Sequence, residues 1–119
     1  MNTRTFRVTV RGVFDGLTDD QRAALLAEAA AHDVLHAAFT PEGSLTYDIA
    51  ARPAFVFRFS DTGEEEEDIL EATERAETAA VAWLTERGYG FKNLRSSAED
   101  LSQAPLSKRQ RRAARSPGT

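Results

Sequence analysis

A run of strict alternation near the N-terminus constrains the fold of this chain more than any other feature. In residues 5–14, TFRVTVRGVF, apolar and polar side chains take turns along the backbone. One side of the run holds Phe6, Val8 and Val10, and the other holds Thr5, Arg7, Thr9 and Arg11. A period of two is typical of a β-strand with one buried and one exposed side. The sequence therefore predicts a sheet with one covered face and one open face.

Similar patterns predict the other elements of the chain. Further strands are expected at VLHAAF (34–39), SLTYDIA (44–50), AFVFRFS (54–60) and YGFKNLRS (89–96). A first helix is expected from a capping box at Thr18 and Gln21 to about His32. A second helix is expected after a capping box at Thr62 and Glu65, with Gly88 as its stop.

This order of elements predicts an α+β fold of the ferredoxin-like split βαβ type. The sandwich would have a four- or five-stranded, mainly antiparallel sheet with two helices on one face, because right-handed crossovers place both helices on the same side. VLHAAF and SLTYDIA would form either an extra hairpin or one bent strand. We expect one domain over residues 1–101 and a basic, flexible tail over residues 102–119, where the regular pattern fades.

Four stretches carry a resemblance to a known group of proteins. They are TFRVTVRGVFDGLTDDQRAALLAEA, GSLTYD, FVFRF and ERGYGFKNL, and they span most of residues 5–94. On these stretches the chain resembles a family of small actinobacterial proteins that is defined as a domain of unknown function. The resemblance implies a ferredoxin-like α+β domain and no assigned activity, and the tail lies outside it.

Composition and charge exclude several classes of function. The chain has no cysteine, which excludes disulfides, cysteine zinc sites and a thiol nucleophile. Neither a signal peptide nor a membrane span is evident, so we expect a soluble cytoplasmic protein. Five of the fifteen basic residues lie in the tail, which has no acid; the remaining ten face nineteen acidic residues, a net charge of −9. An acidic body argues against general nucleic-acid binding, except through the tail.

The open face gathers the residues that could do chemistry. They are Arg7, Arg11, Arg58, Lys92, His36 and Asp48. Arginine forks suit carboxylate or phosphate groups, so the three arginines and the lysine are candidate ligand-binding residues. His36 is the candidate catalytic acid/base, and Asp48 would orient a neighbouring group. We therefore expect a homodimer whose open face binds, and could transform, a small anionic metabolite, without a metal or another cofactor.

Several alternatives remain open from the sequence. The polar strand residues could simply be solvated, or the chain could be a non-catalytic module that docks a protein or nucleic acid through the sheet face or the tail. The spacing of His32 and His36 could hold a metal on a continuous helix, but Asp33 is expected to end that helix. DTGEEEED is expected to be a solvated helix start, because it lacks the ligand pattern of a calcium loop. RNA binding by the sheet is disfavoured, since Phe55, Phe57 and Phe59 are expected to face inward.

Overall fold

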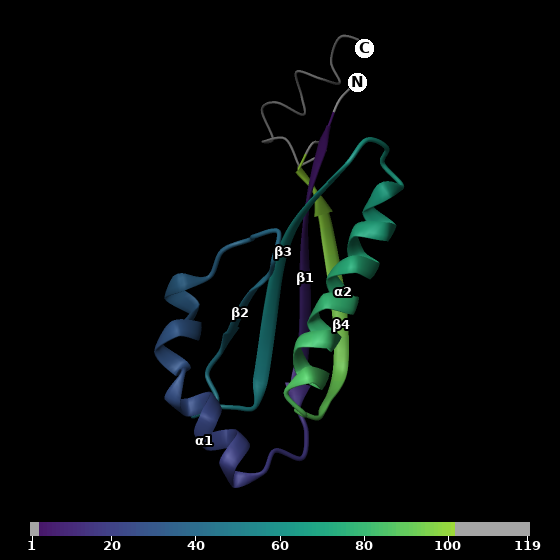
Figure 1. The fold of residues 1–119 in the computed structure, drawn as a ribbon. Helices are drawn as coiled ribbons and strands as arrows, with labels where there is room; N and C mark the ends of the chain where they lie inside the picture. The colour runs from purple at the N-terminus through teal and green to yellow at the C-terminus, as the bar shows by residue number, and fades with distance from the viewer. Residues whose placement is uncertain (1–2, 102–119) are drawn as a thin grey trace, which may run out of the picture.

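A computed structural model describes residues 3–101, and the predicted tail at 102–119 lies outside the described residues. The helices and strands are β1 (Arg4–Phe14), α1 (Asp19–Ala27), the 3-10 helices η1 (Ala29–His32) and η2 (Val34–His36), β2 (Ser44–Tyr47), β3 (Ala54–Gly63), α2 (Asp68–Glu86) and β4 (Phe91–Asp100). The four strands form one sheet in the order β2-β3-β1-β4 (Figure 1). All neighbouring strands in the sheet are antiparallel.

The predicted fold class is confirmed. The molecule is an α+β domain with an open, four-stranded antiparallel sheet and two α-helices, an arrangement compatible with a ferredoxin-like split βαβ fold. The long helix α2 lies along the sheet, whereas α1 lies near one end of it, on the side of β2 (Figure 1). The Gln21 side chain of α1 donates a hydrogen bond of 2.9 Å to the carbonyl of Gly88, just after α2. This bond ties the start of α1 to the end of α2.

The core lies between the sheet and the helices. Its fully buried members include Phe6, Val8 and Val10 of β1, Phe55 of β3, and Leu25 of α1. Helix α2 contributes a row of small side chains spaced four residues apart, Ala72, Ala76 and Ala80, followed by Leu84. Because alanine has a short side chain, this row lets the α2 backbone approach the aromatic rings of the sheet closely.

Local signals locate two of the four ends of α1 and α2. The capping box of α1 is confirmed, since Thr18 and Gln21 exchange both hydrogen bonds. However, α1 ends at Ala27, and a separate 3-10 helix leads to His32. The predicted stop of α2 is confirmed, because Gly88 has a positive φ of 72° and its N–H bonds to a carbonyl of the last turn.

The predicted start of α2 is wrong. β3 continues to Gly63, which pairs with Arg4, so the chain is still in the sheet where a capping box at Thr62 was expected. Helix α2 begins at Asp68 instead. The Asp68 carboxylate accepts hydrogen bonds from the backbone N–H groups of Glu64 and Glu65 at 2.8 and 2.9 Å. These bonds hold the pKa of Asp68 below its usual value.

The predicted strand at VLHAAF is also wrong. Residues 34–36 form η2, because the Asp33 side chain accepts the backbone N–H of Leu35 at 2.9 Å and turns the chain locally. Only Thr40, beyond the run, reaches the sheet, where its carbonyl accepts the N–H of Ser60 at 2.8 Å. The sheet accordingly has four strands, and His36 lies on an exposed 3-10 turn rather than on a strand.

Candidate functional site

The face of the sheet opposite the core carries the polar side chains of β1, β3 and β4; we call it the open face. Strand register fixes which of these side chains are neighbours, since directly opposite residues of antiparallel strands point to the same side. Across β3, β1 and β4 the rows are Ser60–Arg7–Glu99, Arg58–Thr9–Ser97 and Val56–Arg11–Arg95. Four arginines from three neighbouring strands therefore leave the sheet on one face.

All four candidate ligand-binding residues share this face. Arg7 and Arg11 lie on β1, and Arg58 lies opposite Thr9 on β3, so all three point the same way. Lys92 points to the same face, because it is the register partner of Val13. Its Nζ also lies 3.8 Å from the Asp15 carboxylate. Their role in binding a ligand stays a prediction.

The two candidate catalytic residues are separated. Asp48 follows β2 and lines a hollow beside Arg58. His36 is exposed on η2 and does not line that hollow. The predicted strand position of His36 was the reason for placing it beside the arginines, and that position is wrong.

The arginines of the open face form no ion pairs among the described residues, although Glu99 is the register partner of Arg7. The Arg7 guanidinium lies over the Phe39 ring, 4.9 Å from the centroid. Arg58 Nη1 donates a hydrogen bond of 2.8 Å to Thr46 Oγ1. The side chains of Arg11 and Arg95 have no hydrogen bond or ring contact within residues 3–101. None of the four forms an ion pair with a carboxylate within that range.

Two arginines outside the open face, Arg4 and Arg75, are paired with carboxylates, whereas Arg22 and Arg52 form no ion pair within residues 3–101. Arg4, on the same strand as Arg7 and Arg11, donates to the Asp100 carboxylate at 2.8 Å. Arg75 on α2 donates to Asp61 at 2.8 Å, and this hydrogen bond raises the pKa of its guanidinium. The open face thus holds four arginines that form no ion pair among the described residues, although Glu99 lies opposite Arg7 in the same register row.

A hollow of about 430 Å³ opens at the β2 side of this face. Its lining residues are Ala29, Asp33, Val34, Thr46, Tyr47, Asp48, Arg52, Ala54, Val56 and Arg58. Val56 belongs to the same register row as Arg11, so the hollow adjoins the arginines. Its walls are mixed: small apolar groups, two carboxylates and two guanidinium groups.

Tyr47 lines the hollow but is not available for proton transfer near neutral pH. Its hydroxyl donates a hydrogen bond of 2.6 Å to the carbonyl of Leu25. Burial raises the pKa of Tyr47 to about 12, and the negative charge of Glu28 adds to the shift. His32 stacks on the Tyr47 ring, and its Nδ1 lies 2.9 Å from the Leu45 carbonyl oxygen. This part of the wall is therefore fixed by internal hydrogen bonds.

Comparison with known proteins assigns the chain to a family. The family model described as "Family of unknown function (DUF6204)" matches residues 1–112. The chain belongs to this family. No curated protein and no solved structure matches it. The match to the DUF6204 family continues into residues 102–112, beyond the part of the chain that carried the resemblance in the sequence.

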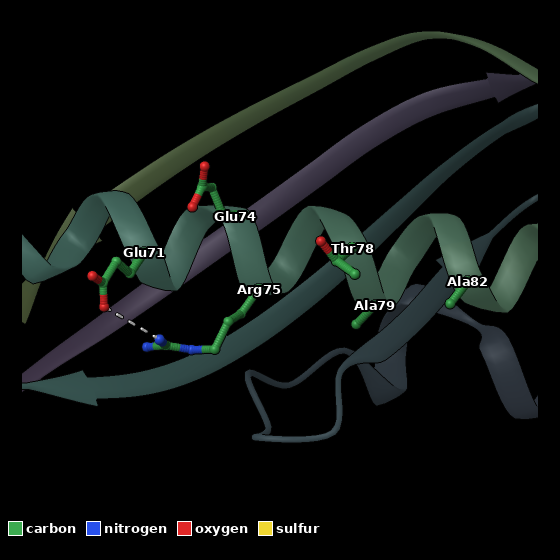
Figure 2. A pocket seen from close by; sticks show the side chains of 6 residues that line it. All are labelled: Glu71, Glu74, Arg75, Thr78, Ala79 and Ala82. Atoms are coloured by element: carbon green, nitrogen blue, oxygen red, sulfur yellow. Dashed lines mark ion pairs between the residues drawn. The ribbon is translucent and has the colours of Figure 1, made fainter.

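A second hollow, of about 560 Å³, lies along the outer side of α2. Figure 2 shows the side chains that line it, with Arg75 reaching toward Glu71. Glu71 and Glu74 give this surface a negative character, and Arg75 is already bound by Asp61 and Glu71. It therefore does not suit the anionic ligand expected from the sequence. No group of three or more metal-binding side chains occurs within residues 3–101, and no helix there is long and apolar enough to cross a membrane.

Arg95 belongs to the open face of this DUF6204 chain but is absent from the candidate residues predicted from the sequence. Leu94 breaks the alternation of apolar and polar residues in the last strand, and such a break is typical of a bulge or a strand end. The structure has a bulge: Asn93 and Leu94 together oppose Gly12, and Asn93 adopts a positive φ of 57°. An asparagine beside the break was the available signal, because asparagine tolerates this backbone conformation better than most residues.

Proposed function

We propose that this protein binds a small anionic molecule on the open face of its sheet. The observation that carries the proposal is the set of four arginines on one face, none of which forms an ion pair with a carboxylate among the described residues. Guanidinium groups bind carboxylate and phosphate through paired N–H donors, so such a face attracts oxyanions. The adjoining hollow offers space for the remainder of the ligand.

The residues around the hollow suggest how a ligand would be held. Arg58 is fixed by Thr46 through one of its N–H groups, which leaves other donors of the same fork for a ligand. Asp48, which lines the hollow, would favour a ligand that also has hydrogen-bond donors, whereas Arg52 would favour further acceptors. The proposal is limited to binding, because His36, the predicted acid/base, does not line the hollow.

A thermal-shift experiment tests the proposal. Citrate and inorganic phosphate would be added to the wild-type chain and to Arg58→Gln, with Arg87→Gln as the matched control. Arg87 lies at the end of α2, over the Trp83 ring, and carries the same charge away from the open face. A ligand at about 100 times its Kd stabilises by about 2.7 kcal/mol, which raises Tm by roughly 10 °C or more for a domain of this size. We expect this shift in wild type and Arg87→Gln and a much smaller one in Arg58→Gln; equal shifts in all three would refute the proposal.

We propose that the predicted homodimer forms through the open faces only when an anion is bound. Two copies stacked through their open faces would bring Arg7, Arg11, Arg58 and Arg95 of each copy toward those of the other. Like charges repel across such an interface, so a bound anion is needed between the two faces. We therefore expect light scattering after gel filtration to show a monomer in chloride buffer and a dimer when a multivalent anion is present. A dimer that forms equally well without the anion would remove the link.

One observation favours a second function, docking of another protein. Val34 and Leu35 on η2 are 64% and 86% exposed, although both are apolar. Neighbouring exposed apolar side chains can mark an interaction site. If they anchor a protein partner, replacing Leu35 with Ser would abolish co-purification of that partner and leave the anion-induced thermal shift unchanged. Loss of the thermal shift in Leu35→Ser would instead assign Leu35 to the ligand site.

A further inference from the structure

The bulge in β4 produces an unusual pair on the open face. Lys92 is the register partner of Val13, and Arg95 is the register partner of Arg11. Without the extra residue at the bulge, alternation from Lys92 would turn the side chain at position 95 toward the helices. The bulge at Asn93 therefore brings Lys92 and Arg95 to the same face and sets Arg95 directly opposite Arg11.

This pair is electrostatically unfavourable in the unliganded protein. Directly opposite residues have Cβ atoms about 4.5–5.5 Å apart, and like charges there destabilise a sheet. The surrounding positions do not relieve the repulsion: Val56 lies beside Arg11 on β3, and Ser97 is the next outward residue on β4. Neither arginine forms an ion pair with a carboxylate within residues 3–101. An anion between the two guanidinium groups would add two attractions that offset the repulsion.

We infer that Arg11 and Arg95 together bind a phosphate group, and that the ligand of the open face is a phosphate monoester. This inference rests on the proposed function and narrows its ligand class. A carboxylate has one charge and two oxygens, which a single guanidinium fork satisfies. A phosphate monoester carries a charge of about −1.5 to −2 and has three terminal oxygens, so it suits two forks that reach it from neighbouring strands.

The position of Arg11 and Arg95 also indicates where the organic group of the ligand would lie. Val56 separates Arg11 from the hollow on the β2 side of the face and lines that hollow. A phosphate held by Arg11 and Arg95 would direct its organic group across Val56 into the hollow. Arg58, two residues along β3 from Val56, then contacts the organic group or a second charge. Arg11 and Arg95 would thus select the phosphate, whereas Arg58 would contribute to binding any anion.

Two probes that share an apolar body but differ in the anionic group test the inference. Phenyl phosphate and benzoate would be titrated calorimetrically into wild type, Arg95→Gln, Arg95→Lys and Arg58→Gln, with Arg87→Gln as the control. In wild type and Arg87→Gln we expect phenyl phosphate to bind at least about tenfold more tightly than benzoate, the factor for 1.4 kcal/mol. Arg95→Gln should lose this preference, and Arg95→Lys should recover it only in part, because lysine supplies charge without the planar fork. Arg58→Gln should weaken both probes and keep the preference.

The possible outcomes separate the inference from the proposed function. Equal binding of the two probes to wild type, with a loss of both in Arg58→Gln, would overturn the phosphate inference and leave anion binding standing. Binding of neither probe to wild type would overturn both. If the Arg95 variants fail to fold, the wild-type protein gives the answer through NMR of its arginine side chains. Phosphate should then shift the Nε–H signals of Arg11 and Arg95, and unchanged signals would refute the site.

Discussion

If Arg11 and Arg95 repel each other, removing either charge should stabilise the unliganded protein. The two residues are direct register partners on β1 and β4, so their Cβ atoms lie about 5 Å apart. Their guanidinium groups can separate to about 8 Å by bending away from each other. Coulomb's law with the dielectric constant of water then gives a repulsion of about 0.8 kcal/mol at 5 Å and about 0.5 kcal/mol at 8 Å. For a domain of this size, that corresponds to a rise in Tm of roughly 2–6 °C for a single replacement.

A double-mutant cycle isolates this term. Urea unfolding of wild type, Arg11→Gln, Arg95→Gln and the double variant would be measured in chloride buffer without phosphate or citrate. We expect a coupling energy of about 0.5–0.8 kcal/mol in 10 mM salt, with the sign of a repulsion. At 1 M salt the screening length falls to about 3 Å, so the coupling should nearly vanish.

Replacing another arginine of β1, Arg4, should change stability in the opposite direction. Arg4→Gln removes an ion pair of 2.8 Å with Asp100, whose side chain is only 7% exposed, and should destabilise the protein. A coupling between Arg11 and Arg95 that is zero at low salt would show that they do not sense each other. A coupling that persists unchanged at 1 M salt would show that it is not a charge effect. Either result would remove the electrostatic argument for an anion between them.

Three further predictions concern the frame around the site. Burial raises the pKa of Tyr47 to about 12, so between pH 10 and 12 the unfolded chain loses this proton while the folded protein keeps it. The free energy of unfolding of wild type should therefore fall by up to about 2 kcal/mol over this range. Urea unfolding of Tyr47→Phe at the same pH values should lack this decline. Gly43 has a φ of 94°, and an added Cβ would collide with the Phe59 ring, so Gly43→Ala should lower the unfolding free energy by more than about 2 kcal/mol in urea. Asn93→Gly should keep or raise Tm, whereas Asn93→Val should lower stability by roughly 1–3 kcal/mol, because valine resists a positive φ; equal Tm values would contradict the assigned bulge.

The sequence predicts those parts of the fold that depend on alternation or on a complete local motif. The parity of β1 and β3 follows directly from the spacing of apolar residues, and Phe55, Phe57 and Phe59 are buried as expected. The capping box at Thr18 and the stop at Gly88 also need only nearby atoms. These signals suffice for the fold class and for the face on which the arginines of these two strands lie.

Two errors have the same physical origin, competition between alternatives that local sequence does not rank. At VLHAAF, an apolar run typical of a strand loses to a hydrogen bond from Leu35 to the Asp33 side chain. At Thr62, a plausible capping box loses to the pairing of Gly63 with Arg4, which lies far away in the sequence. The first error moves His36 off the sheet, and so it removes the predicted proton-transfer group from the open face.

The bulge at Asn93 moves the centre of the candidate site. Parity predicts that Arg7, Arg11 and Arg58 bind the anion, but Phe39 and Thr46 already contact the guanidinium groups of Arg7 and Arg58. One additional residue in β4 turns Arg95 outward, opposite Arg11, where neither side chain has an acidic partner among residues 3–101. A shift of one residue in the register of a strand turns each of its side chains to the other face of the sheet. The position of a single bulge therefore decides which arginines lie opposite each other. The binding site therefore depends on a backbone irregularity, and its charge pair can be tested independently of any ligand.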